Sequence, residues 1–274
     1  MAAKHILVTG GNSGIGFALC KLLIKDHDCY VYLGSRSLER GQAALDTIKK
    51  EVADKADKIE LVQIDVGDDD SCKKAAEALK TKGVKLFALV NNAGIMKAEV
   101  DVVMNTNYYG PKRVTEALVD LIDPSEGRIV NVCSGAACVW LKFQDDATKK
   151  LFSNPDVTFE ELDKAVKEHL AAKNFGSVEV SKENGYGLSK AALNCLTLIQ
   201  ARGHPNLLVT SLCPGFIDTP MTKGYGAKLT PEQGCVSSIK CLFGEVKSGC
   251  FYVSDGLRGP LTIYREPGMP EYEG

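Results

Sequence analysis

Tyr186 and Lys190 are the residues in this sequence whose types and spacing best suit proton transfer. They stand in the segment YGLSK, and a separation of four places both side chains on one face of a helix. A phenol exchanges a proton near neutral pH only when its pKa is lowered, and an adjacent ammonium group stabilises the phenolate. The spacing therefore indicates an acid/base pair, although the same pattern occurs in many helices with only a structural role.

Three glycines near the N-terminus suit a dinucleotide site. Gly10, Gly14 and Gly16 lie in TGGNSGIG, between an apolar run and a helical pattern. Such a turn lets the backbone approach a diphosphate closely, and the N-terminus of the following helix faces the phosphates. The spacing GxxxGxG differs from GxGxxG, so an ordinary turn is the alternative. The position directly after the first predicted strand favours the dinucleotide site.

Arg36 indicates which dinucleotide is bound. It follows Leu33-Gly34-Ser35 at the end of the second predicted strand, where an acidic residue would accept hydrogen bonds from a free ribose 2′-hydroxyl. An arginine there pairs instead with a 2′-phosphate, so the sequence predicts NADP(H); a solvated arginine at a strand end is the alternative. Asp65, after the third predicted strand, either accepts from the adenine amino group or caps the following turn.

These residues lie at the junctions of alternating apolar runs and helical patterns. The alternation predicts an α/β fold with a parallel sheet covered on both faces, in a single domain over residues 1–274. The predicted strands are 4–9, 29–35, 59–65, 86–91, 128–133, 207–212 and a last one at 249–253. The predicted helices are 17–25, 39–53, 70–80, 100–122, 186–201 and 231–243.

Two segments depart from this alternation. Residues 139–182 are helical and charged without a clear strand, which indicates an insertion before Tyr186, and residues 255–274 contain several prolines and glycines, which indicates an irregular arm across the surface. Within the insertion one apolar stripe faces a charged side of Glu160, Glu161, Asp163, Lys164 and Lys167. The stripe consists of Phe159, Leu162, Val166 and Leu170, and we expect it to cover Leu193, Leu196 and Leu198 of the following helix.

Composition limits the partners. The chain has 274 residues, 45% of them apolar, and 33 basic against 35 acidic residues, so no long-range attraction to nucleic acid is expected. Its ten cysteines fall singly in apolar segments and its four histidines lack metal-ligand spacing, which predicts a reducing, cytoplasmic location and no metal. No leader or membrane-spanning run is evident, so we expect no membrane association.

Four motifs in order resemble the short-chain dehydrogenase/reductase family: TGGNSGIG at 9–16, NNAG at 91–94, NVCS at 131–134 and YGLSK at 186–190. The resemblance covers nearly the whole chain and implies a Rossmann-type, doubly wound sheet. It implies that Tyr186 is the acid/base, that Lys190 lowers its pKa and holds the nicotinamide ribose, that Ser134 binds the substrate oxygen, and that Asn107 anchors a proton-relay water.

The positions that match the family's cofactor-binding motifs form a larger set. With Tyr186 and Lys190 they are Gly10, Asn12, Ser13, Gly14, Ile15, Gly16, Arg36, Asp65, Val66, Asn91, Ala93, Gly94, Pro214, Gly215, Ile217 and Thr219. Cys133 and Ser134 are neighbours at a strand end and face opposite ways, so only one can reach the substrate. The family pattern selects Ser134 and leaves Cys133 to the core.

The insertion makes the chain similar to the monomeric carbonyl reductases of this family, which implies a monomer that reduces an aldehyde, ketone or quinone with NADPH. The alternatives are a retinol- or steroid-type alcohol dehydrogenase and an NADP(H)-binding redox sensor without turnover. The substrate itself is not identified. Trp140, Leu141, Phe143 and residues 216–225 are candidate pocket walls, and each is equally consistent with core packing.

Overall fold

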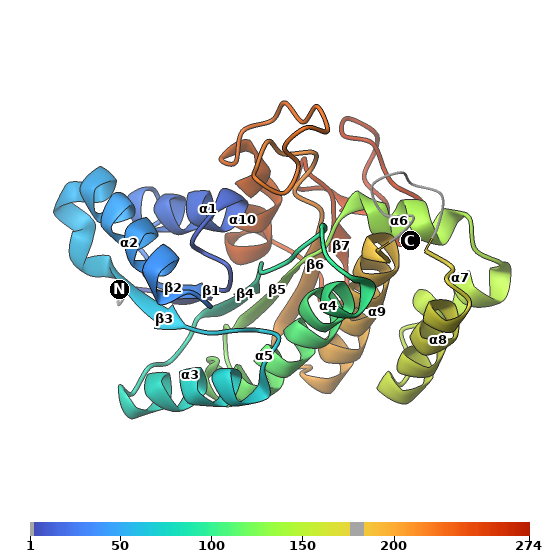
Figure 1. Ribbon diagram of the computed structural model, residues 1–274, viewed down its shortest axis with the longest axis horizontal. Helices are drawn as coiled ribbons and strands as arrows, with labels where there is room; N and C mark the ends of the chain where they lie inside the picture. Colours follow the sequence, from blue (N-terminus) through green and yellow to red (C-terminus); the bar gives the residue numbers. More distant parts are fainter. Residues whose placement is uncertain (1–2, 176–183) are drawn as a thin grey trace.

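The apolar runs form the strands of one mixed sheet in the computed structural model, which describes residues 3–175 and 184–274 (Figure 1). Its order in the described part is β3-β2-β1-β4-β5-β6-β7-β8. All neighbouring pairs are parallel except β7 and β8. The strands are β1 His5–Val8, β2 Tyr30–Ser35, β3 Ile59–Gln63, β4 Ala88–Asn91, β5 Arg128–Val132, β6 Leu208–Leu212, β7 Phe251–Tyr252 and β8 Arg258–Gly259. The predicted doubly wound α/β fold is confirmed.

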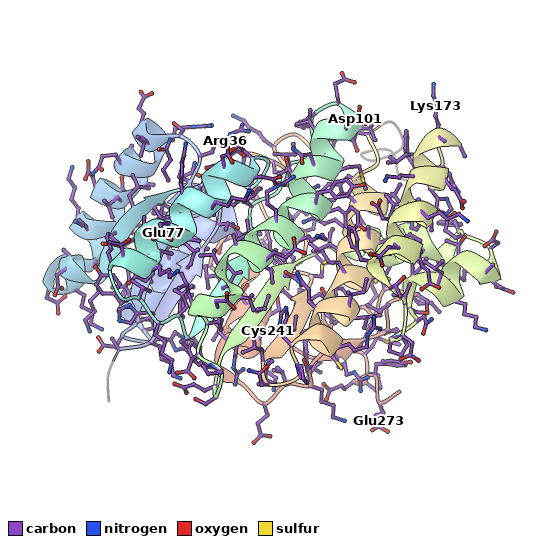
Figure 2. The ribbon with its side chains drawn as sticks, turned by 90° about the horizontal axis from the view of Figure 1, so that it is seen from below. Arg36, Glu77, Asp101, Lys173, Cys241 and Glu273 are labelled. Atoms are coloured by element: carbon purple, nitrogen blue, oxygen red, sulfur yellow. The ribbon has the colours of Figure 1, made fainter. Side chains whose placement is uncertain are left out.

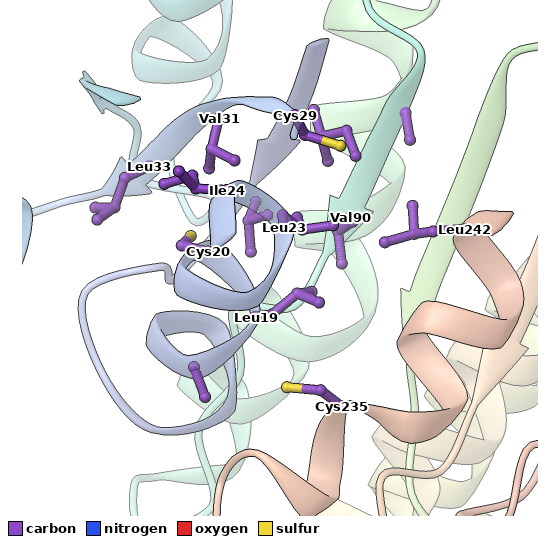
Figure 3. Close-up of a cluster of buried hydrophobic side chains, with 14 of the residues drawn as sticks. Leu19, Cys20, Leu23, Ile24, Cys29, Val31, Leu33, Val90, Cys235 and Leu242 are labelled. Carbon is purple, nitrogen blue, oxygen red and sulfur yellow. The ribbon is translucent and has the colours of Figure 1, made fainter. Parts of the chain in front are cut away.

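Helices cover both faces of the sheet because successive strand residues point to opposite sides (Figure 1). Ile6 and Val8 pack beneath α1 Gly14–Lys25, α2 Leu38–Val52 and α10 Val236–Phe243, and Figure 3 shows part of this cluster around Leu19 and Leu23. Leu7 packs on the other side, against α3 Asp69–Thr81 and α5 Gly110–Leu118. The helix α9 Tyr186–Gly203 lies on this second face, towards β6.

The predicted helix over 100–122 is interrupted. It consists of α4 Val100–Met104, a π-helical turn η2 Asn105–Tyr109, then α5 and a 3₁₀ turn η3 Val119–Leu121. A π-helical turn widens the backbone by one residue and is frequent at functional sites. Similarly, a 3₁₀ turn η4 Gln233–Cys235 precedes α10, and another 3₁₀ segment, η1 Ala53–Lys58, follows α2.

The insertion is helical, but its first helix begins earlier than predicted. The helix α6 Gly135–Lys142 starts directly after Ser134, whose side chain accepts a hydrogen bond from the Ala136 amide and so caps it. It is followed by α7 Asp146–Phe152 and α8 Phe159–Ala171, and α8 begins with a capping box of Thr158 and Glu161. Residues 176–182 of the predicted insertion lie outside the described residues.

The apolar stripe of α8 covers α9 as predicted, with one exception. Leu162 and Val166 are fully buried in one cluster with Leu193 and Leu196, and Phe159 and Leu170 pack at its edge. Leu198 is not part of this contact, because its side chain lies beside Gly249. The acidic Asp163 was expected to face solvent, yet its Oδ1 accepts a 2.6 Å hydrogen bond from the Tyr109 hydroxyl of η2.

The C-terminal arm differs from the expected irregular surface segment. Residues 258–259 form β8, which pairs antiparallel with β7, so the strand predicted at 249–253 is not the last one. Arg265 is 7% exposed, and Pro260 lies beside α6, where its carbonyl is 3.6 Å from the Cys138 sulfur. A proline-rich and glycine-rich composition gave no signal for this buried anchoring.

Candidate active site

A cavity of about 740 Å³ opens at the carboxyl ends of the strands. This is the edge at which parallel α/β sheets bind their ligands. Its lining comes from the turn after β1, the ends of β2 and β3, the loop after β4, the end of β5, the first turn of α9, the loop after β6 and the C-terminal arm. Segments far apart in the sequence therefore share one site.

The glycine turn forms one wall of this cavity, and its geometry requires glycine. Gly10 and Gly14 have φ of 66° and 55°, the left-handed region that side chains disfavour. A Cβ on Gly16 would lie 2.5 Å from the Gly10 carbonyl oxygen, so α1 packs directly against the turn. The Ser13 side chain makes no capping hydrogen bond and the first turn of α1 contains no acidic residue. The helix N-terminus is thus available to a phosphate, and a diphosphate fits the turn.

The end of β2 supplies cations to the same cavity. Arg36, which Figure 2 labels, borders it and is exposed. Arg40 in the first turn of α2 also borders it and is exposed. Asp65 also lines the cavity while its Oδ1 accepts a 2.9 Å hydrogen bond from the Gly67 amide. The two interpretations of Asp65 are compatible, since one carboxylate both caps the turn and borders the ligand space. The positive end of the cavity suits a phosphate monoester.

The opposite end of the cavity brings together Ser134, Tyr186 and Lys190. Tyr186 is 9% exposed, and its hydroxyl lies within hydrogen-bonding reach of the Ser134 side chain. Burial raises the pKa of Tyr186 to about 12, and the bond from Ser134 partly offsets that rise. Tyr186 is therefore a neutral proton donor at neutral pH in the ligand-free protein.

Lys190 is buried beneath this pair. Its Nζ donates a 2.7 Å hydrogen bond to the Val132 carbonyl and lies 5.9 Å from the centre of the Tyr186 ring. Burial lowers the pKa of Lys190. The expected depression of the Tyr186 pKa by Lys190 is not seen here, because burial of the phenol dominates and the ammonium is tied to the backbone of β5.

Asn107 lies behind the cavity wall in the π-helical turn. Its Oδ1 accepts from the Ile95 amide at 2.9 Å, and its Nδ2 donates to the Ile95 carbonyl at 2.8 Å and to the Ser189 hydroxyl at 3.1 Å. A Cβ on Gly94 would lie 3.3 Å from this Oδ1 and 3.5 Å from Lys190 Nζ, so both polar atoms face the same small space.

The neighbours Cys133 and Ser134 are placed differently. Both border the cavity, but Ser134 reaches Tyr186, whereas the Cys133 sulfur contacts the Lys190 carbonyl oxygen at 3.7 Å. Burial raises the pKa of the Cys133 thiol to about 12, so it stays protonated and unreactive. This placement agrees with the choice of Ser134.

Most of the remaining predicted cofactor residues line the cavity, with Asn91 as the exception. The Asn91 side chain is buried and donates to Asn131 at 2.9 Å and to Thr115 at 3.2 Å. Its neighbour Asn92 borders the cavity instead, and the Asn92 side chain donates to the Thr9 carbonyl at 2.8 Å. The residues that line the cavity as predicted are Gly10, Asn12, Ser13, Gly14, Ile15, Gly16, Arg36, Asp65, Val66, Ala93, Gly94, Tyr186, Lys190, Pro214, Gly215, Ile217 and Thr219.

The candidate substrate walls need correction. Trp140 and Leu141 are core residues, Phe143 is 64% exposed, and none of the three borders the cavity, although Phe216 does. Met221 of the predicted stretch 216–225 also borders it. The walls that sequence reasoning missed include Arg40, Ile95, Met96, Lys97, Ala136, Val139 and Tyr264. Residues 95–97 directly follow the NNAG motif, which was an available signal, whereas nothing in the sequence pointed to Tyr264.

Over 3–175 and 184–274, no group of three or more His, Cys, Asp and Glu side chains is arranged to hold a metal ion. No helix in these ranges is long and apolar enough to cross a membrane.

The chain is similar in sequence and in fold to known oxidoreductases. The sequence profile of the short chain dehydrogenases matches residues 4–144. The (+)-neomenthol dehydrogenase of Arabidopsis thaliana is 33% identical, with 91% of this chain and 95% of the relative aligned. The NADPH carbonyl reductase 1 of Homo sapiens is 31% identical over 85% and 88%. The structure of the menthone neomenthol reductase from Mentha piperita has a TM-score of 0.78 at 29% identity, with 93% of this chain and all of that chain (100%) covered.

Proposed function

Because the chain belongs to the short chain dehydrogenase family, we propose that it reduces the carbonyl group of an aldehyde, ketone or quinone with NADPH. The observation that carries the proposal is the shared cavity, which has Ser134 and Tyr186 at one end and the glycine turn with Arg36 at the other. One end has the groups that handle a carbonyl oxygen and the other has those that hold a dinucleotide phosphate. The names of its relatives, a neomenthol dehydrogenase and an NADPH carbonyl reductase, agree with this oxidoreductase chemistry.

NADP(H) is the cofactor that the residues fit. Gly16 packs closely against Gly10, and because neither residue has a side chain, a diphosphate can approach the N-terminus of α1. Arg36 and Arg40 give the ribose end a positive charge that a 2′-phosphate would neutralise, and neither Gly34 nor Ser35 supplies the acidic side chain that a free 2′-hydroxyl favours. When bound, NADPH supplies the hydride that adds to the carbonyl carbon.

The protein's own residues handle the oxygen. As negative charge develops on it, the Ser134 hydroxyl and the Tyr186 hydroxyl each donate a hydrogen bond, and Tyr186 then gives up its proton to form the alcohol. The net change is one hydride on carbon and one proton on oxygen. The raised pKa of Tyr186 suits this direction because the phenol is protonated at neutral pH.

Lys190 and Asn107 support this step. Lys190 holds the nicotinamide ribose and stabilises the Tyr186 phenolate that remains after proton transfer. Asn107 and Lys190 present polar atoms to the space beside Gly94, and we assign to this space a water that returns a proton to Tyr186. Both roles follow the family pattern at matching positions.

A monomer in the cytoplasm is the accompanying proposal. The stripe of α8 covers Leu193 and Leu196 within the chain, which removes an apolar surface that a second subunit would otherwise bury. All ten cysteines are free and nine of them are buried, which suits a reducing compartment.

The proposal is tested by following NADPH absorbance with a panel of quinones, aldehydes, monocyclic ketones and steroids. We expect turnover with NADPH to exceed that with NADH, and Tyr186→Phe to abolish turnover with every substrate. Turnover restricted to the oxidation of lipid alcohols would favour the dehydrogenase alternative. NADPH binding without turnover on any compound would favour a sensor.

A further inference from the structure

The C-terminal arm, residues 255–274, contributes one residue to the cavity wall, Tyr264. In Figure 1 the red end of the chain lies beside α6, the helix that begins after Ser134. The family resemblance assigned no role to this arm, and its contacts are more extensive than a surface tail requires.

The Tyr264 ring packs on the residue that follows the catalytic serine. A Cβ on Gly135 would lie 2.8 Å from Tyr264 Cε2 and 2.9 Å from Cδ2, so the ring rests on the bare glycine backbone. The Tyr264 hydroxyl lies within hydrogen-bonding reach of Ser254 and Cys213. Cys213 also borders the cavity and its sulfur accepts from the Gly135 amide at 3.1 Å. Tyr264 thus contacts Gly135, the residue that follows Ser134 in the chain.

An ion pair between buried Arg265 and partly buried Asp255 holds this ring in position. Arg265 Nη1 donates to both carboxylate oxygens of Asp255, at 2.9 and 3.0 Å, and the side chains are 5% and 23% exposed. Asp255 also accepts from the amides of Leu257 and Gly268, each at 3.1 Å. Arg265 donates further to the carbonyls of Pro270, at 2.7 Å, and Met269.

The ion pair therefore joins the beginning of the arm to its middle and closes residues 255–265 into a loop. Pairing of β8 with β7 fixes the loop to the sheet edge. All three guanidinium nitrogens of Arg265 are hydrogen-bonded within the arm, to Asp255, Pro270 and Met269, so the residue next to Arg265 in the chain is held in one place. Breaking the pair would release Tyr264 without altering its side chain.

The surroundings of Tyr264 indicate what it selects. The cavity walls at this end include Met96, Ala136, Val139 and Phe216, which are apolar. A rigid ring over an apolar space limits the size of the group attached to the carbonyl carbon. The arm contains a second tyrosine, Tyr272, which is 43% exposed, stacks on Arg258 and does not border the cavity.

We propose that Tyr264 is a specificity-determining residue that restricts the site to compact apolar ketones, and that Asp255 and Arg265 are positioning residues that hold it there. This inference rests on the proposed function for its kinetic test. It concerns the shape of the substrate end and leaves the dinucleotide end unchanged, since Tyr264 lies on Gly135 and is not among the atoms nearest to Gly10, Gly14 or Gly16.

The first experiment compares kcat/KM for a one-ring ketone, cyclohexanone, and a three-ring quinone, phenanthrenequinone. Tyr264→Ala should raise the ratio in favour of the larger compound by about tenfold or more, the scale on which pocket volume discriminates substrates. Tyr264→Phe keeps the ring and Tyr272→Ala removes a tyrosine outside the cavity, so both should keep the wild-type ratio. NADPH affinity should be the same in all four proteins. An unchanged ratio in Tyr264→Ala, or an equal change in Tyr272→Ala, overturns the proposal.

The second experiment tests the ion pair. Asp255→Asn should shift the ratio in the same direction through KM, with kcat for cyclohexanone retained, and should speed hydrogen exchange at the Leu257 and Gly268 amides. Glu266→Gln removes an exposed charge of the same arm and should change neither. Faster exchange in Asp255→Asn with an unaltered ratio would show that the pair is structural only and overturn its positioning role.

Calorimetric binding of the two compounds to the NADP⁺-saturated proteins separates this inference from the proposed function. Wild-type protein that reduces neither compound contradicts the proposed function, and the arm is then judged by whether Tyr264→Ala gains affinity for the larger compound. If Tyr264→Ala gains neither kcat/KM nor affinity for the larger compound, the role of the arm is contradicted and the proposed function is not affected.

Discussion

Lys190 donates its hydrogen bond of 2.7 Å to the carbonyl oxygen of Val132, the last residue of β5. The ammonium is therefore fixed to the sheet two residues before Ser134, and α9 is fixed with it. Tyr186 begins α9 and Ser134 follows β5, so this bond between the helix and the strand fixes the position of Tyr186 relative to Ser134.

Lys190 should determine where activity is lost at alkaline pH. The reduction needs the protonated phenol, so its rate is full below the pKa of Tyr186 in the cofactor complex and falls as pH rises through it. Burial outweighs the Lys190 charge in the ligand-free protein, so the effect is predicted for the NADPH-saturated protein. There Lys190→Met should move the alkaline limb of kcat/KM up by about 1 to 3 pH units while the plateau falls. A limb that stays in place would show that another group sets the pKa of the acid.

Tyr186→Phe removes the transferable proton and keeps the ring. We expect turnover to fall by at least about a thousandfold, the scale of a lost general acid together with a lost oxygen donor, with NADPH affinity preserved. Fluorescence titration of NADPH and single-turnover kinetics measure the two quantities separately. Appreciable residual reduction would mean that the proton comes from elsewhere.

Ser134→Ala and Cys133→Ala form a matched pair at adjacent positions. Loss of the Ser134 hydroxyl removes one of two donors to the developing oxyanion and should lower kcat by about a hundredfold or more. Cys133→Ala leaves the oxygen contacts intact and should keep kcat within a few fold, at a modest cost in stability from the lost sulfur. The reverse order of effects would exchange the roles of the two neighbours.

Arg36→Ala should weaken NADPH binding by about 1 to 3 kcal/mol, the usual worth of a charge-assisted hydrogen bond, and leave NADH binding almost unchanged. Arg40 borders the same end of the cavity, so Arg36→Ala/Arg40→Ala should lose more than either single variant. Equal weakening for the two cofactors, measured by titration, would remove the 2′-phosphate role.

The strand positions could be predicted from the sequence, whereas contacts between distant segments could not. Apolar periodicity predicted the strands after which Arg36, Asp65 and Ser134 stand, because a strand buried on both faces needs a continuous apolar run. Local pattern could not predict the π-helical turn around Asn107, since its widened geometry depends on contacts with the Ile95 backbone from another loop. Tyr264 was missed for the same reason. Its position depends on an ion pair between Asp255 and Arg265, which are ten residues apart, and on the absence of a side chain at Gly135.

The assembly state is the remaining consequence of the insertion. Leu162 and Val166 of α8 are fully buried against Leu193 and Leu196 of α9. Intact protein should therefore scatter light as a monomer of 29.5 kDa. Leu162→Ala should lower the free energy of unfolding by about 2 to 5 kcal/mol through the cavity that it leaves.

The double variant Leu162→Asp/Val166→Asp should detach α8 from α9, because two unpaired carboxylates cannot be buried in an apolar contact. The exposed face of α9 should then drive association or aggregation at micromolar concentration. Lys164→Asp changes charge on the exposed side of the same helix, where the lysine side chain is 80% exposed, and should remain monomeric. A stable dimer or tetramer of the unmodified protein would contradict the shielding by α8, whereas the roles of Ser134 and Tyr186 do not depend on it.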